Sequence, residues 1–313
     1  MILSTGTPAW NSQFFFLGLL GLLSVGQTAA AESAPSASAS SAKVVVADVG
    51  FATPECVLHL VEDDVYLVSN INGSPFAADG NGFISRLGPD GSVVELKWID
   101  GSTDGVTLNA PKGMGVSAGT LYVTDVDHVR MFDAKTGAAK GEVKLDGSTF
   151  LNDVAVASDG TVFVSDSGFS DGFKPSGSDA IYKFNAEGGT TKIIAGEALG
   201  HPNGLLAKES GDLVVVSFGS GEVYMVSGGS SAERSAGVKT EQGSLDGIVA
   251  LGSGDVLVSS WGASAVYRGK EGGPFTAVVS EVDAPADIGW DAKRSRVLIP
   301  LFKTNSVVIQ EIK

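Results

Sequence analysis

Hydrophobic and polar positions alternate along the chain in a unit that occurs six times. Each unit has a Pro, Leu or Ala, a polar residue, a short apolar strand, an acidic or glycine turn and a second apolar strand. The units begin "PECVLHL", "PKGMGVS", "LNDVAVA", "PNGLLAK", "LDGIVAL" and "ADIGWDA". Short apolar runs bounded by turn residues are typical of β-strands, and no long helical periodicity accompanies them. The pattern predicts an all-β protein.

The spacing between the polar residues of successive units gives the length of the repeat. The polar residue falls at Glu55, Lys112, Asn152, Asn203, Asp246 and Asp287. A spacing of roughly 40 to 50 residues is typical of the blades of a propeller. We therefore expect a six-bladed β-propeller with four-stranded antiparallel blades around a central channel. A two-sheet sandwich is the rival, but it would not account for six phased repeats. The apolar run 44–48 is expected to add a strand to the last blade and so close the ring.

The first strand of each propeller blade lies nearest the axis, so the six polar residues are expected to converge at one mouth of the channel. A buried amide without a partner costs about 1–3 kcal/mol, which predicts that water or an ion satisfies this ring. Glu55, Asn152, Asn203 and Asp246 offer hard oxygen ligands that suit calcium. The residue types leave magnesium and manganese open. Zinc is disfavoured because the sequence has no Cys/His cluster.

The other two positions of the ring carry opposite charges. Lys112 and Asp287 either pair with each other or contact a substrate. Trp261 ends the second apolar strand of the fifth unit, where it either packs against the core or stacks on a substrate. Two long connections, 72–82 and 167–179, leave strands at the same end of the blades. We expect both to cover the mouth of the channel and to shape a pocket there.

Composition limits the partners of the protein. The chain has 313 residues, of which 43% are hydrophobic and 18% charged, enough for a large core. A net charge of -15 would repel nucleic acid and anionic membrane surfaces, so small molecules or cations are the expected partners. Cys56 is the only cysteine, which excludes an intramolecular disulfide. We interpret it as a small buried hydrophobic residue.

The N-terminal segment has the features of an export signal. Residues 1–31 carry no charged side chain, and the apolar run 14–26 is too short to span a bilayer. We predict a signal peptide over 1–31 with cleavage near Ala31, the alternative being an uncleaved anchor. Residues 32–42 are predicted to form a flexible linker and 43–313 the propeller. The mature protein is then secreted or periplasmic, without a stable membrane anchor.

Three segments carry a resemblance to a known family. "FLNDVAVASDGTVFVSD", "HPNGLLAKESGDLVVVS" and "SLDGIVALGSGDVLVSSWG" resemble the senescence-marker-protein/gluconolactonase family, which includes regucalcin, and the likeness extends over about residues 44–312. Paraoxonase and diisopropyl fluorophosphatase are similar in metal arrangement. In the family a Glu, two Asn and an Asp hold a catalytic divalent metal, commonly calcium. By motif position these residues correspond to Glu55, Asn152, Asn203 and Asp246.

The resemblance implies a metal-dependent hydrolase of lactones or related esters. Water would attack the carbonyl, activated by Asp246 or Glu55, and the family favours Asp246 as base or nucleophile. The chain departs from the family pattern at "PECVLHLVEDD", which lacks the usual Gly-Pro after the Glu. Lys112 in "APKGMGV" matches no known substrate residue of a gluconolactonase. The alternative is a non-catalytic propeller that binds a ligand or protein and holds a structural metal on its axis.

Overall fold

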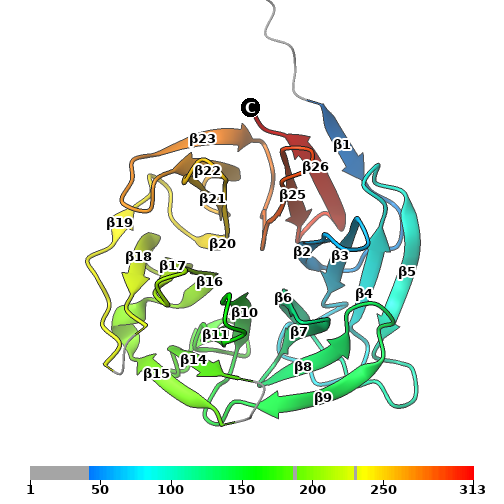
Figure 1. Ribbon diagram of the computed structural model, residues 1–313, viewed down its shortest axis with the longest axis horizontal. Coiled ribbons are helices and arrows are strands. Elements are labelled where there is room, and N and C mark those ends of the chain that lie inside the picture. Colours follow the sequence, from blue (N-terminus) through cyan, green and yellow to red (C-terminus); the bar gives the residue numbers. More distant parts are fainter. Residues whose placement is uncertain (1–41, 186–188, 229–230) are drawn as a thin grey trace, which may run out of the picture. The chain divides into compact units, whose positions relative to one another are not determined.

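Six small antiparallel sheets form a ring in the part of the chain that the computed structural model describes, residues 42–185, 189–228 and 231–313 (Figure 1). Each sheet has four strands, which confirms the prediction of a six-bladed β-propeller. The predicted signal peptide (1–31) and all but the last residue of the predicted linker (32–42) lie outside the described residues. Within the described ranges, no helix is long and apolar enough to cross a membrane.

Each of the first five blades is built from strands that follow one another in the sequence. Blade 1 contains β2 (Pro54–Leu60), β3 (Val65–Asn70), β4 (Phe83–Leu87) and β5 (Val93–Asp100). Blade 2 contains β6 (Pro111–Ser117), β7 (Thr120–Asp125), β8 (His128–Asp133) and β9 (Ala139–Lys144). Blade 3 contains β10 (Leu151–Val156), β11 (Val162–Asp166), β14 (Ala180–Phe184) and β15 (Thr191–Ala195). Blade 4 contains β16 (Pro202–Ala207), β17 (Leu213–Ser217), β18 (Glu222–Val226) and β19 (Val238–Lys239). Blade 5 contains β20 (Leu245–Ala250), β21 (Val256–Ser260), β22 (Ala265–Gly269) and β23 (Phe275–Ser280).

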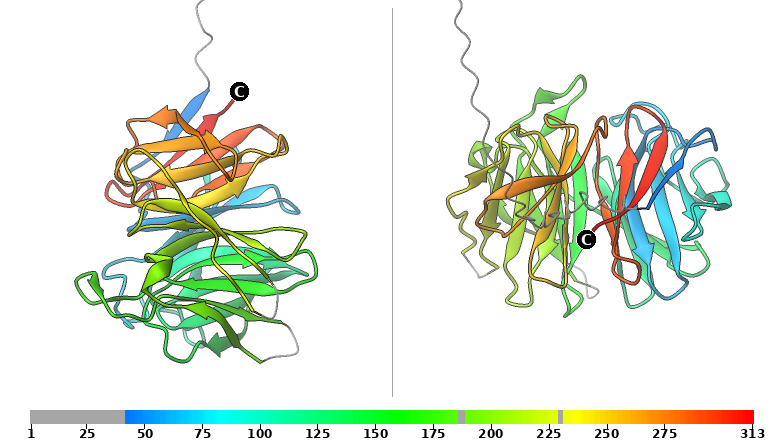
Figure 2. Two further views of the ribbon diagram at one scale, coloured as in Figure 1. Left: turned by 90° about the vertical axis from the view of Figure 1, so that its left-hand side faces the viewer. Right: turned by 90° about the horizontal axis from the view of Figure 1, so that it is seen from above.

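Blade 6 is completed by both ends of the described chain. It contains β24 (Gly289–Asp291), β25 (Arg296–Leu301), β26 (Ser306–Glu311) and, as its outermost strand, β1 (Lys43–Val46). β1 and β26 lie side by side and pair antiparallel (Figures 1 and 2). This confirms that the apolar run after residue 43 closes the ring. Outside the blades, a hairpin of β12 (Phe169–Ser170) and β13 (Lys174–Pro175) interrupts blade 3, and η1 (Glu197–Leu199) is a short 3-10 turn.

The valine-rich second strands occupy the interior of the ring. Every residue of β17 is buried, and the same is true of β11 and β21. Their side chains point to both faces of the blade, so each face packs against the neighbouring blade. One such cluster joins blade 1 to blade 2 through Leu67 and Ile84 on one side and Leu121 and Val123 on the other. Because the chain has only one cysteine, no intramolecular disulfide can form. Apolar packing between blades therefore holds the propeller together.

The closing strand offers a test of this packing with a matched control. Val46 is 5% exposed and pairs with Val307, whereas its neighbour Val45 is 55% exposed. We expect Val46→Ala to lower the free energy of unfolding by about 1–3 kcal/mol, because the substitution removes buried methyl groups. Val45→Ala should change it by less than about 0.5 kcal/mol. Thermal unfolding of both variants measures the difference, and equal losses would show that β1 does not seal blade 6.

A β-bulge near the start of each of the first five innermost strands aims one side chain at the axis. In blade 3 the register shifts between Leu151 and Val154, so Asn152 and Asp153 lie inside the bulge. The backbone N–H of Asp153 donates to Oγ of Ser165 at 3.0 Å, and that hydroxyl donates to the carbonyl of Asn203 in blade 4 at 2.7 Å. Bulges of this kind re-aim side chains beside functional sites. The hydroxyl also ties one bulge to the next.

Candidate active site

The four oxygen-bearing residues predicted from the repeat line one pocket at the axis. Glu55, Asn152, Asn203 and Asp246 come from β2, β10, β16 and β20, the innermost strands of four different blades. The pocket has a volume of about 330 Å³, and each of the four residues is at most 5% exposed. Lys112, from β6 of blade 2, lines the same pocket. The structure therefore brings together the residues that the sequence placed at equivalent positions.

Each of the four residues has a buried oxygen without a hydrogen-bond partner among the described residues. The atoms are Oε2 of Glu55, Oδ1 of Asn152, Oδ1 of Asn203 and Oδ1 of Asp246. Unpaired buried polar atoms are costly and rare, so these four oxygens are expected to be satisfied by water or by an ion. Two carboxylates and two amide oxygens form a hard donor set that matches calcium. The donors thus fit a divalent cation, although the described part contains no group of three or more His, Cys, Asp or Glu suited to a metal.

The orientation of Asn152 is fixed by hydrogen bonds behind the pocket. Its Nδ2 donates to Oγ of Ser167 at 3.0 Å, and Ser167 in turn donates to the carbonyl of Pro202 at 2.7 Å. With the amide nitrogen bound on this side, Oδ1 faces the pocket. The residues that end the second strands fix, in a similar way, the backbone just before the first strands. Asp166 accepts the backbone N–H of Phe150 at 3.0 Å, and Asp125 accepts that of Ala110 at 2.7 Å.

The structure corrects the sixth position of the axial ring. Pro285 bridges to Leu301 at the end of β25, as Pro54 pairs with Asn70 in blade 1. Ala286 therefore occupies the position of Glu55, and its carbonyl accepts the hydroxyl of Ser259 at 2.7 Å. The prediction that Asp287 belongs to this ring is wrong by one residue.

Asp287 instead lies one step deeper in the channel. It bridges to Cys56 of blade 1 and is not among the residues that line the pocket, nor does it form an ion pair with Lys112 in the described structure. Asp153 of blade 3 occupies the same deeper layer. Two glycines in this layer have no room for a side chain, because a Cβ on Gly113 would lie 2.5 Å from Asp153 and one on Gly247 2.5 Å from Asp287. These glycines let the two buried carboxyl groups fit into the channel.

Burial raises the pKa values of the carboxyl groups in the pocket. Burial, followed by the charges of Asp246 and Asp287, raises the pKa of Glu55 well above its ordinary value, and Lys112 partly opposes the shift. Burial and then the charge of Asp153 raise the pKa of Asp246 to about 8. Several carboxyl groups close together in a dry site disfavour one another's ionised form. A divalent cation would relieve this repulsion.

Lys112 is a fully buried lysine that faces the candidate metal ligands. Its side chain is 1% exposed, Nζ donates to the carbonyl of Ala110 at 3.2 Å, and Nζ lies 4.5 Å from the centre of the Phe150 ring. Burial lowers the pKa of Lys112 to about 8, against the opposing charges of Glu55, Asp125 and Asp166. With one hydrogen-bond acceptor and one ring as partners, the amine has a further N–H for a bound molecule.

Both long connections contribute to the wall of the pocket. Pro75 from 72–82 and Phe169 and Phe173 from 167–179 line it, as expected for loops that cover the mouth. Trp261 also lines the pocket. Its buried Nε1 makes no hydrogen bond of normal geometry within the described residues, but it interacts with the carboxyl group of Asp246 and partly opposes the upward shift of its pKa. Its ring contacts Phe218 and Phe302, so the two interpretations of this residue are compatible: it packs and it faces the cavity.

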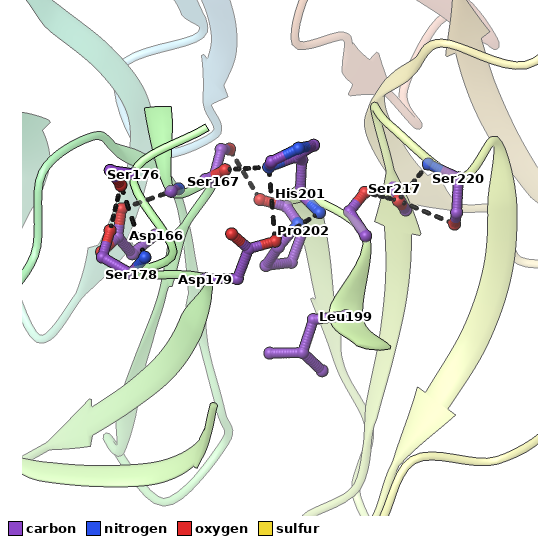
Figure 3. Close-up of polar contacts among 12 residues, drawn as sticks. Asp166, Ser167, Ser176, Ser178, Asp179, Leu199, His201, Pro202, Ser217 and Ser220 are labelled. Carbon is purple, nitrogen blue, oxygen red and sulfur yellow. Dashed lines mark hydrogen bonds and ion pairs between the residues drawn. The ribbon is translucent and has the colours of Figure 1, made fainter. Parts of the chain in front are cut away.

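His201 supports the pocket from behind, a role that its sequence position did not reveal. Figure 3 shows it next to both Asp179 and Ser167. Its Nδ1 is 2.7 Å from the carbonyl of Ser167 and 3.3 Å from Oδ2 of Asp179, and its backbone N–H donates to the same carboxylate at 2.7 Å. The imidazole stacks on Phe169 with ring centres 4.2 Å apart. His201 therefore fixes an aromatic side chain of the wall rather than facing a metal.

The fold and the site together define a propeller protein with an oxygen-lined polar centre on its axis. The model of the SMP-30/gluconolactonase/LRE-like region matches residues 89–288, and the chain belongs to this family. A comparison with curated proteins gives no significant match.

Solved structures share the fold at low sequence identity. A gluconolactonase from Xanthomonas campestris is similar over 87% of this chain and 90% of its own, with a TM-score of 0.68 and 16% identity. A virginiamycin B lyase from Staphylococcus aureus covers 87% of this chain and 99% of its own, with a TM-score of 0.61 and 14% identity. At such identities the likeness shows the architecture, and function must be argued from the pocket.

Proposed function

We propose that the protein is a hydrolase of lactones or related esters that depends on a divalent metal, with calcium as the metal. The observation that carries the proposal is the set of four buried oxygens without partners in one pocket. Membership of a family whose model is named after gluconolactonase supports the reaction type. Glu55, Asn152, Asn203 and Asp246 would hold the cation, which when bound would polarise the carbonyl of the substrate.

The side chains of the pocket account for the proton transfers. Asp246 has two carboxylate oxygens, so one can face the cation while the other accepts a proton from the attacking water. As the C–O bond of the ester breaks, the leaving oxygen needs a proton, and the Lys112 ammonium supplies it. Lys112 suits this role because its pKa of about 8 lies close to neutral pH. Glu55, beside these groups, would hold the metal, and its charge offsets that of Lys112.

The test is hydrolysis of lactones by the purified protein with calcium and with a chelator. We expect turnover of at least one member of a lactone and ester panel in calcium, loss of turnover in chelator, and recovery when calcium is restored in excess. Hydrolysis that persists in chelator would contradict metal dependence. A complete lack of turnover in calcium would contradict the hydrolase and favour a binding propeller with a structural metal.

A further inference from the structure

The wall of the pocket above the polar centre is apolar nearly throughout. Besides the four candidate metal ligands and Lys112, the lining consists of eight side chains, all apolar or aromatic: Ile71, Pro75, Phe150, Phe169, Phe173, Phe218, Trp261 and Phe302. Among the side chains that line the pocket, polar groups belong to the floor, with one exception, the indole N–H of Trp261. A molecule that fills this pocket therefore meets aromatic carbon on its sides and charged groups at one end.

One part of the wall is a continuous arc supplied by three consecutive blades. Phe218, Trp261 and Phe302 each follow the last residue of the second strand in blades 4, 5 and 6. The centres of the Phe218 and Trp261 rings are 5.5 Å apart, and those of Trp261 and Phe302 are 5.1 Å apart. Edge-to-face and tilted contacts of this kind hold aromatic rings in fixed orientations. The arc is thus a preorganised surface.

The rest of the aromatic wall comes from loops and the hairpin. Phe173, between β12 and β13, lies 5.1 Å from Phe76, 5.9 Å from Phe150 and 5.7 Å from Phe169, measured between ring centres. Its side chain is 49% exposed, and it is the one exposed aromatic residue in the described ranges. Phe169 joins this group to the arc through Phe218 at 6.4 Å. An exposed ring beside an apolar pocket is a surface that a bound apolar group would cover.

We infer that the substrate is an apolar lactone or ester bearing an aryl or alkyl group, and not a polyhydroxylated sugar lactone. The inference rests on the proposed function, since it names the substrate class of the same site. The aromatic wall gains from burying an apolar group against it. Sugar hydroxyls would lose water on entry and would find no side-chain acceptor or donor along the wall apart from Trp261 Nε1. The polar side chains at the floor would bind the metal and the carbonyl group of the substrate.

Three lactones with the same six-membered ring test the substrate class. Dihydrocoumarin carries a fused aromatic ring, δ-valerolactone has no substituent, and glucono-δ-lactone carries hydroxyl groups. We expect kcat/KM, divided by the uncatalysed hydrolysis rate of each compound, to be highest for dihydrocoumarin and at least about 30-fold lower for glucono-δ-lactone. Calcium-dependent hydrolysis with glucono-δ-lactone preferred would overturn the inference and leave the proposed function standing.

A substitution in the wall links the preference to named residues. Phe173→Ser should lower the preference for dihydrocoumarin over δ-valerolactone by about 3- to 10-fold, because it removes one aromatic contact. Val94→Ser is the matched control, since Val94 is 60% exposed on the outer strand β5 and does not line the pocket. An unchanged preference in Phe173→Ser, or an equal change in both variants, would contradict a role for this wall.

Binding of lactams separates the substrate class from catalysis. Lactams keep the ring and its carbonyl but resist hydrolysis, so calorimetric titration of the full chain in calcium measures recognition alone. We expect 3,4-dihydroquinolin-2-one to bind more tightly than gluconolactam, whether or not any lactone is turned over. If no lactone is hydrolysed but this order holds, the hydrolase fails and the apolar ligand class stands. Equal binding, or tighter binding of gluconolactam, overturns the inference.

Discussion

Asp246→Asn is expected to lower kcat/KM for lactone hydrolysis by about 10²- to 10⁴-fold while leaving the propeller folded. The substitution keeps the size of the side chain and one oxygen, but it removes both the negative charge and the proton acceptor. Loss of a general base alone has an effect of this order. The fold should persist because Oδ1 of Asp246 has no hydrogen-bond partner in the described structure to lose.

The control for this variant is the same chemical change in the same blade. Asp255 precedes β21 and forms ion pairs with Arg268 and Lys270 away from the pocket. Asp255→Asn should keep turnover within about twofold of the wild type, because Asp255 does not line the pocket and ion pairs near the surface contribute little to stability. Steady-state kinetics compares kcat/KM of the two variants with that of the wild type, and circular dichroism verifies that both are folded. Turnover by Asp246→Asn at the wild-type rate would exclude Asp246 as the base.

The fold and the polar residues that line the pocket were predictable because both follow from a local repeat. A strand pair with a polar residue at a fixed place recurs in the sequence, and propeller symmetry converts that place into a ring. The repeat alone was enough to place Asn203 and Asp246 in the pocket. The closing strand near Lys43 was predictable for the same reason, since the last blade lacks a strand in the repeat count.

The sixth unit shows where the repeat misleads. The sequence "PADIG" has a polar residue only at Asp287, so the pattern places it in the ring. In the other units the ring residue directly follows the first strand residue, and in blade 6 that position is Ala286. Two adjacent residues lie inside each bulge, and the sequence pattern alone does not tell which of them faces the axis. The pairing of Pro285 with Leu301 and the hydrogen bond from Ser259 to the carbonyl of Ala286 distinguish them.

Part of the aromatic wall could be predicted from the sequence. Phe218, Trp261 and Phe302 occupy equivalent places after the second strands, so the repeat contains the signal that they face one cavity. Phe169 and Phe173 belong to an irregular insertion with no counterpart in other blades. Their convergence depends on how that hairpin packs, which repeat periodicity does not encode.

Calcium at about 100 times its dissociation constant is expected to raise the unfolding temperature by about 5–10 °C relative to chelator. Binding to the folded state alone adds about 2.7 kcal/mol at this concentration, and 1 kcal/mol corresponds to about 2–4 °C in a domain of this size. Asp246→Asn should lose most of the shift because the amide supplies no charge, whereas Asp255→Asn should keep it. Differential scanning calorimetry measures all three proteins.

The size of the calcium shift should also grow between pH 5 and pH 8. In chelator, burial and the charge of Asp153 raise the pKa of Asp246 from 3.8 to about 8 in the folded protein. A folded pKa above the unfolded one contributes stability that is complete below pH 3.8 and is lost as the pH rises through 8. Calcium stabilises the ionised carboxylate, so it binds more weakly at pH 5, where protons compete for the site. A shift that is independent of pH, or one that Asp246→Asn retains in full, would mean that calcium stabilises the protein somewhere other than this ring of oxygens.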